Sequence, residues 1–372
     1  MVGFLSATIE GHRAADYSKP LRFQRFHQRI SPDALFYPPY AMLQSLALSR
    51  WSPGQTLVII GGNSIMNGVG QPLDVLWSIR LQERLGPAFH VVNLAFRSGY
   101  PAHAGALVAE QLIRQGYPVV YVTNTNPTAG AGVSAKPPYG YLYWQARAQG
   151  EVAPYGPRDA AVQSWLASLD QAQRHEVMEE RISASLEAWT RHQSLWHHIA
   201  YRHFFSVWSP LMAHRFWQPR ATVPDFEPPA PPLHERYKAP LEYEMNMVRG
   251  YSYLSGVHTN DGTWAFSESA AQNLREEIDA AFPSLIRPHM LVLLDENSPY
   301  YRDQLAADEQ ARNDAVYAGC AAIWEAMGIK CIVTGRGFTA MDYIDRSHLS
   351  GDGGEKLASL VASQIQTITP HE

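Results

Sequence analysis

The stretch TLVIIGGNSIMNG, residues 56–68, decides the fold of this chain. Its first half is a short run of aliphatic and β-branched side chains, which is typical of a strand buried on both faces. Two glycines follow, and they permit a tight turn in which the backbone approaches a ligand closely. Ser64 stands after this turn and before a helix. The stretch therefore predicts a strand, a turn and a helix, with a serine at the junction.

Four further apolar runs have the same character, and helical patterns lie between them. The predicted strands cover residues 56–61, 90–95, 118–124, 289–295 and 329–335, and the predicted helices lie near residues 72–85, 103–115, 266–282, 303–327 and 352–367. Strands that alternate with helices indicate a mostly parallel sheet with helices on both faces. We expect a three-layer α/β/α sandwich with a flavodoxin-like, five-stranded sheet.

The third and fourth predicted strands are far apart in the sequence, and this gap divides the chain. Because it exceeds the length of an ordinary crossover connection, residues 128–287 are predicted to be a mainly helical insertion that caps the site. The α/β core then comprises residues 51–127 and 288–372. Residues 1–50 are predicted to be an N-terminal extension with a helix after Pro39.

The composition excludes several classes of protein. The formal net charge is −5 and Lys and Arg are spread along the chain, so the basic stripe of a nucleic-acid-binding protein is missing. Cys320 and Cys331 are the only cysteines, which is too few for a disulfide framework, and they lack the paired spacing of a zinc site. Neither a signal peptide nor an apolar stretch of the ~20 residues that a spanning helix needs is evident. A cytoplasmic location is the default expectation, although a chain trimmed of an export segment would look the same.

Polar loops follow the predicted strands, and in a doubly wound sheet ligands bind at the carboxyl ends of the strands. A serine hydroxyl needs a base to become a nucleophile, and His348, in the loop before the last helix, is the best candidate. Asp345 can hold the imidazole in the correct tautomer and stabilise its cationic form. We therefore predict a catalytic triad of Ser64, His348 and Asp345. Because the base must be neutral, activity should fall as the pH drops through the range in which an imidazole takes up a proton, ordinarily near 6.5.

Two blocks at the ends of this core resemble those of a known family. GGNSIMNG (61–68) resembles the GDSxxxG block of the SGNH, or GDSL-like, hydrolases, and DRSHLSGDGGEKLA (345–358) resembles the DxxH block that precedes their last helix. Asn63 stands where the family usually has Asp, a change that keeps a short polar side chain. The resemblance covers the core strands and loops and does not extend to the insertion. It implies acyl transfer through a serine ester, without a cofactor.

The middle blocks of that family provide its oxyanion hole, and here they match more loosely. VVNLAFRSGY (91–100) and YVTNTNP (121–127) are the corresponding stretches. The resemblance assigns the oxyanion to the N–H groups of Ser64 and Gly99 and to the side chain of Asn126. The glycine lies one position later than usual, and NTNP replaces the usual GxND. Ser98 and Asn124 are therefore alternative donors.

Four aromatic residues lie just beyond the third predicted strand. They are Tyr139, Tyr141, Tyr143 and Trp144. Aromatic faces give large, rigid contact areas, so we predict that this group forms a platform for an acyl or sugar group of the substrate.

Residues 195–217, in the predicted insertion, are rich in aromatic and histidine side chains. Packing against the core, or a lid over the site, is the favoured interpretation. An amphipathic helix at a membrane surface is the alternative. His197, His198 and His203 have neither a HExxH-like pattern nor an accompanying carboxylate, so no metal site is predicted.

These residues together predict a serine-dependent acyl-ester hydrolase, such as an esterase, a lipase or a carbohydrate deacetylase. With a sugar hydroxyl in place of water, the same residues would make an O-acyltransferase that acts on a polysaccharide or a cell-envelope polymer. The long insertion and the looser middle blocks, which resemble the branches that acylate such polymers, motivate this alternative. The altered middle blocks also leave a third hypothesis, a non-catalytic binding protein built on a decayed hydrolase fold.

Overall fold

The structure is a computed structural model, and it divides into two compact units that are each described by themselves. The described residues are 28–31, 34–36, 40–72, 75–95, 99–127, 163–175, 177–178, 181–182, 240–254, 257–260 and 263–368. One unit comprises Met1–Arg50, Tyr139–Ala153 and Leu169–Asp225, and the other comprises Trp51–Pro138, Pro154–Ser168 and Phe226–Glu372.

The second unit is built on a five-stranded parallel sheet with the strand order β4-β3-β5-β8-β9. Its strands are β3 (Thr56–Ile60), β4 (Phe89–Asn93), β5 (Val119–Thr125), β8 (Met290–Asp295) and β9 (Lys330–Thr334). In chain order this is the arrangement 2-1-3-4-5 of flavodoxin-like sheets. The predicted fold class is confirmed, and each predicted strand is present to within a residue or two.

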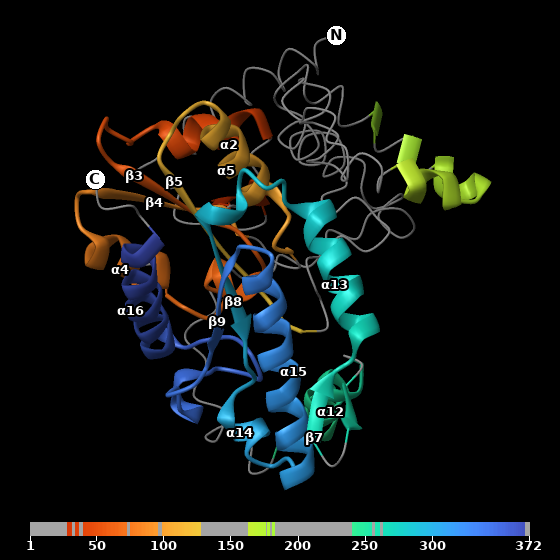
Figure 1. The fold of residues 1–372 in the computed structure, drawn as a ribbon. Coiled ribbons are helices and arrows are strands. Elements are labelled where there is room, and N and C mark those ends of the chain that lie inside the picture. Colours follow the sequence, from red (N-terminus) through yellow and green to blue (C-terminus); the bar gives the residue numbers. More distant parts are fainter. Residues whose placement is uncertain are drawn as a thin grey trace, which may run out of the picture. The chain divides into compact units, whose positions relative to one another are not determined.

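Helices cover both faces of this sheet (Figure 1). α4 (Trp77–Leu85) and α16 (Gly351–Ile368) pack against each other on one side, and α13 (Glu268–Ala281) and α15 (Ala307–Ala326) lie on the other. α5 (Ala104–Arg114) packs against β3 and β5. The sheet is thus the middle layer of an α/β/α sandwich, which explains why its strands are nearly continuous apolar runs.

Several short elements of this unit were not predicted from the sequence. α12 (Glu242–Leu254) and α14 (Pro299–Arg302) contact each other, and β6 (Val257–Asn260) pairs with β7 (Thr263–Phe266) in an antiparallel hairpin. Gly319 lets this hairpin lie close to α15, because a Cβ there would stand 2.5 Å from the Cβ of Phe266. Two 3-10 helices, η3 (Arg287–His289) and η4 (Ala340–Asp342), precede β8 and the loop before α16.

The first unit contributes fewer described elements. β1 (Gln28–Ser31) and β2 (Ala34–Phe36) form an antiparallel pair, and α2 (Tyr40–Leu48) confirms the predicted helix after Pro39. Residues 171–175 are helical. Within the described ranges of both units, no helix has the length and apolar composition needed to cross a membrane.

The interior of the sheet becomes polar at one end. Val119 to Val122 of β5 are apolar and buried, whereas Thr123, Asn124 and Thr125 are polar and equally buried. Buried polar groups require hydrogen-bond partners, so the carboxyl end of β5 is a place where other elements must supply them. The strands β3 and β8 on either side of β5 end at the same edge.

Candidate active site

The turn that carries Ser64 follows the buried strand β3. Gly62 adopts a φ of +103°, and a Cβ at this position would lie 2.2 Å from Oδ1 of Asn124, so only glycine fits. Asn63 then caps α3 (Ser64–Asn67), since its Oδ1 accepts a hydrogen bond of 2.9 Å from the N–H of Ile65. Ser64 is thereby fixed at the first position of a helical turn.

Buried amide side chains support this helical turn from behind. The Nδ2 group of Asn67 donates to the carbonyl of Ala95 at 2.8 Å, and that of Asn93 donates to the carbonyl of Met66 at 3.0 Å. The indole N–H of Trp77 donates to the same carbonyl at 2.7 Å. Both asparagines and the tryptophan are buried, so these bonds tie α3 rigidly to the end of β4.

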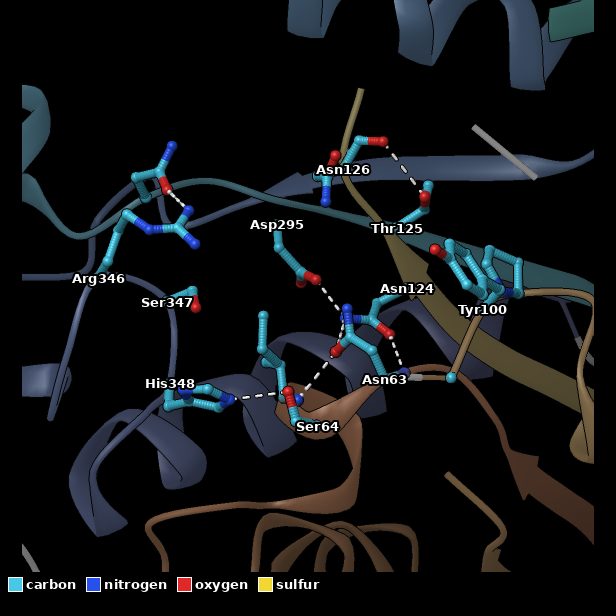
Figure 2. A pocket seen from close by; sticks show the side chains of 14 residues that line it. Asn63, Ser64, Tyr100, Asn124, Thr125, Asn126, Asp295, Arg346, Ser347 and His348 are labelled. Atoms are coloured by element: carbon cyan, nitrogen blue, oxygen red, sulfur yellow. Dashed lines mark hydrogen bonds between the residues drawn. The ribbon is translucent and has the colours of Figure 1, made fainter. Parts of the chain in front are cut away.

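His348 and Asp345 lie in the loop between η4 and α16. Figure 2 shows the ring of His348 next to the hydroxyl of Ser64, which comes from the turn after β3. Nε2 of His348 is 2.8 Å from Oγ of Ser64, and Nδ1 is 2.6 Å from Oδ2 of Asp345. The carboxylate cannot donate, so Nδ1 carries the proton and Nε2 accepts from the serine hydroxyl. The three residues predicted as a triad are hydrogen-bonded in series.

The carboxyl group of Asp345 is held in its ionised form. Its Oδ1 accepts the backbone N–H groups of Ser347 at 2.8 Å and His348 at 2.7 Å. Burial alone would raise the pKa of Asp345, but the side-chain bond and charge of His348 and these backbone bonds outweigh it and lower the pKa to about 2. Asp345 is therefore an acceptor for the imidazole throughout the physiological range.

A polar pocket of about 360 Å³ opens over Ser64 and His348. Gly99 and Asn126, the predicted oxyanion donors, both line it, and so does the alternative Asn124. Ser64 is the first residue of α3, where the backbone N–H has no acceptor within the helix, and this N–H is the third predicted donor. The other alternative, Ser98, lies outside the described residues.

The hydrogen bonds of Asn124 decide against it as an oxyanion donor. Its Nδ2 group donates one hydrogen to Oδ1 of Asn63 at 2.8 Å and the other to Oδ2 of Asp295. Its own Oδ1 accepts the backbone N–H of Asn63 at 3.0 Å. Both donor hydrogens of Asn124 are thus engaged with protein groups. Asn126, the predicted donor, follows the end of β5 and lines the pocket.

The loop that begins at Gly99 is anchored on its inner side. Nδ1 of His103 accepts the N–H of Tyr100 at 3.0 Å, and the hydroxyl of Tyr121 donates to the carbonyl of Pro101. His103 is buried, and burial lowers its pKa to about 3, so the ring stays neutral and keeps this acceptor. The position of Gly99 therefore depends on a neutral histidine beneath it.

Asp295, Asn297 and Arg346 are among the pocket residues that the sequence analysis missed. Arg346 links the loop before α16 to two other segments, because its guanidinium lies 2.5 Å from Glu244 on α12 and 2.9 Å from Oδ1 of Asn297. The backbone carbonyl of Arg346 also accepts the N–H of Ser298 at 2.8 Å. Asp295 is the last residue of a predicted strand and Asn297 follows it two positions later, and that position at the carboxyl edge was the available signal.

The remaining predicted contact residues belong to other parts of the chain. Tyr139, Tyr141, Tyr143 and Trp144, and likewise His197, His198 and His203, lie outside the described residues. The same holds for residues 195–217 as a whole, so the lid and membrane-surface interpretations stay predictions.

Comparison with known proteins adds no assignment. No protein-family model matches the sequence, and no curated protein matches it. The resemblance to the SGNH hydrolases therefore remains a prediction that rests on the sequence blocks quoted above.

Proposed function

We propose that this protein is a serine-dependent acyl-ester hydrolase of the SGNH kind. One observation carries the proposal: Oγ of Ser64 lies 2.8 Å from Nε2 of His348, whose Nδ1 lies 2.6 Å from Asp345. A serine, a base and a carboxylate that orients the base are what nucleophilic acyl transfer requires. A binding protein on a decayed hydrolase fold has no need to preserve this alignment between residues 284 positions apart in sequence.

The reaction would proceed in two steps, acylation of Ser64 and hydrolysis of the acyl-enzyme. Oγ of Ser64 attacks the acyl carbon while its proton passes to Nε2 of His348, and the oxyanion is met by the N–H groups of Ser64 and Gly99 and by Asn126. Collapse breaks the ester bond, and the alcohol leaves with the proton from His348. Water then attacks the acyl-enzyme with His348 as base, which releases the acid and restores Ser64. Each oxyanion donor of this kind contributes ~3 kcal/mol in the transition state.

The pocket walls favour a polar alcohol as the leaving group. Amide groups of Asn126 and Asn297, the guanidinium of Arg346 and the phenol-bearing Tyr100 surround the triad. Amide and guanidinium groups hydrogen-bond to hydroxyls, whereas a long acyl chain would need an apolar lining. A polyhydroxylated ester suits this lining better than a lipid. The same observation supports the second candidate, transfer of the acyl group to a glycan hydroxyl.

The proposal is tested with a fluorophosphonate probe and short-chain p-nitrophenyl esters. We expect the probe to label Ser64, identified by peptide mass spectrometry, and hydrolysis to disappear in Ser64→Ala. Ser359→Ala serves as the matched control, since Ser359 lies on α16 and bonds only to its own helix at Glu355. Equal rates in the wild type and Ser64→Ala, or labelling of His348→Ala as fast as the wild type, would contradict the proposal.

Hydrolysis and transfer are distinguished by the molecule that accepts the acyl group, which is water in the first and a glycan hydroxyl in the second. If the protein is a transferase, an acylated wild-type enzyme should lose its acyl group faster when a glycan is added, and the group should appear on the glycan. Release at the same rate with and without glycan indicates hydrolysis.

The cytoplasmic location expected from the sequence also stays a prediction, which fractionation of the producing cells would test.

A further inference from the structure

Asp295 is a second carboxyl group in the pocket, and the triad does not use it. It ends strand β8 at the carboxyl edge of the sheet, and its side chain points toward Asn124, above Ser64 and His348 (Figure 2). Oδ2 accepts a hydrogen of the Asn124 amide, and Oδ1 lies 3.5 Å from the hydroxyl of Thr334. Both partners are neutral side chains.

The surroundings of Asp295 differ from those of the next residue in the chain. Within the part of the chain that the structure describes, no Lys or Arg forms an ion pair with Asp295, whereas Glu296 lies 2.9 Å from Arg302 and 3.9 Å from Arg336. Asp295 is half-buried in the pocket wall, and a carboxyl group that loses much of its contact with water without gaining a cation holds its proton more tightly. Burial accordingly raises the pKa of Asp295 to about 8, against the smaller lowering effects of the bonds from Asn124 and Thr334.

The charged and titratable groups around Asp295 come from several elements. The loop before α16 supplies His348, which is paired with Asp345, and Arg346, which is paired with Glu244 of α12. Tyr343, just before that loop, has its pKa raised by burial and then by Asp295 and Glu296. Within the part of the chain that the structure describes, Asp295 is bonded to the amide of Asn124 on β5 and the hydroxyl of Thr334 on β9, which are neutral. The hydroxyl of Tyr317 on α15 donates to its backbone carbonyl.

Asp295 is connected to the nucleophile by a chain of hydrogen bonds. One amide group, that of Asn124, binds Asp295 with one hydrogen and Oδ1 of Asn63 with the other, at 2.8 Å. Asn63 in turn caps the helical turn that begins with Ser64. The orientation of the Asn124 amide, and with it the position of the Ser64 turn, is therefore set from the far side by Asp295.

We propose that Asp295 is a positioning residue that works in its protonated, neutral form, and that its ionisation in alkaline solution inactivates the site. The inference rests on the proposed function. As a neutral acid, Asp295 accepts from Asn124 and holds the Ser64 turn without adding charge to the pocket. As an anion, it places a negative charge in the same cavity in which the oxyanion develops, and this repulsion disfavours the transition state.

Two substitutions separate the hydrogen bond from the charge. Asp295→Asn keeps an oxygen that accepts from Asn124 and can never ionise, whereas Asp295→Ala removes the acceptor. We expect Asp295→Asn to match the wild type at pH 7, and Asp295→Ala to lose about a hundredfold in kcat with little change in KM, as a misplaced nucleophile does. Asp279→Asn, which removes a carboxylate paired with Arg287 on the surface, is the matched control and should change neither.

The pH profile is the decisive measurement. Between pH 7 and 9.5 the kcat of the wild type should fall about tenfold as Asp295 ionises, and that of Asp295→Asn should stay level, after subtraction of the rate of Ser64→Ala. The same alkaline fall in both proteins would overturn the proposal. So would an Asp295→Asn protein that folds normally but has less than a tenth of the wild-type kcat at pH 7, because the ionised carboxylate would then be the required form.

Infrared spectroscopy tests the protonation state without any assay of activity. The wild type near neutral pH should show the C=O stretch of a protonated carboxyl group that is absent from Asp295→Asn and disappears on titration above pH 9. Absence of that difference band overturns the proposal even if Asp295→Ala fails to fold. A wild type that hydrolyses no ester and escapes the fluorophosphonate, yet shows the band, would contradict the proposed function and not the protonation of Asp295.

Discussion

Replacement of His103 by asparagine should make the stability of the protein less sensitive to acid. His103 is 8% exposed and accepts the N–H of Tyr100 through Nδ1, so it must be neutral in the folded protein. Its pKa is lowered by burial from 6.5 to about 3. Below pH 6.5 the unfolded chain therefore binds a proton at His103 that the folded chain does not bind, and unfolding is favoured.

The magnitude follows from these two pKa values. The stability that a neutral His103 provides is fully present above pH 6.5 and is lost as the pH falls from 6.5 toward 3, by about 1.4 kcal/mol for each pH unit. Between pH 7 and pH 5 this amounts to about 2 kcal/mol in the free energy of unfolding. The loop at risk carries Gly99, so the same protonation should disturb the candidate oxyanion hole before the whole unit unfolds.

The assay is urea unfolding at pH 7 and at pH 5, followed by circular dichroism. Wild type and His103→Asn lose stability together through other groups, but the wild type should lose about 2 kcal/mol more between the two pH values. His175→Asn, which removes an exposed histidine, is the control and should behave as the wild type does. Equal losses in the wild type and His103→Asn would show that folding does not hold His103 neutral, and the reasoning would be wrong.

Two further predictions concern the triad and its turn. Asp345→Asn should lower kcat about 10⁴-fold, because an amide facing Nδ1 of His348 selects the wrong tautomer of the imidazole. The circular dichroism spectrum should not change. A loss of tenfold or less in steady-state assays would refute this role of Asp345. Gly62→Ala should lower the free energy of unfolding, measured by urea titration, by about 1–3 kcal/mol more than Gly54→Ala does. Both glycines have a positive φ, but of the two only Gly62 is so close to Asn124 that a Cβ would meet its side chain. Equal losses in these two variants would show that the close approach of the turn to Asn124 is not needed.

The strands of the sheet were predictable because burial on both faces leaves a simple pattern. Val58 and Ile60 of β3 and Leu291 and Leu293 of β8 are all fully buried, so the sequence there is aliphatic without interruption. The short hairpin β6–β7 escaped prediction for the opposite reason, since its strands have four residues each. Its place against α15 depends on the absence of a side chain at Gly319, which no local pattern indicates.

The residues Ser64, His348 and Asp345 were predictable from the sequence, and the hydrogen bonds of the amide groups beside them were not. Ser64, Asp345 and His348 stand in blocks whose residue types suffice to suggest their chemistry, and the parallel topology brings those blocks to one edge. Asn124 and Asn126 are two residues apart in one block, and sequence alone does not tell that the side chain of Asn124 is bonded to Asn63 and Asp295. These bonds arise because β5 continues to Thr125, so that Asn124 is buried within the strand, while Asn126 follows the end of the strand.

The network of Asn63, Asn124 and Asp295 shows how an asparagine fits at position 63, where the family that the sequence resembles usually has Asp. An aspartate at position 63 would be an acceptor only, and it would bring a negative charge to the cap of α3. An asparagine there still caps the helical turn through Oδ1, and that same oxygen accepts the amide of Asn124. The second hydrogen of Asn124 then needs another acceptor, and Asp295 provides it from β8. The carboxyl group of this part of the site thus stands at the end of β8, which β5 separates from β3 and the Ser64 turn, and its partial burial without a cation is the ground for the neutral form that we propose.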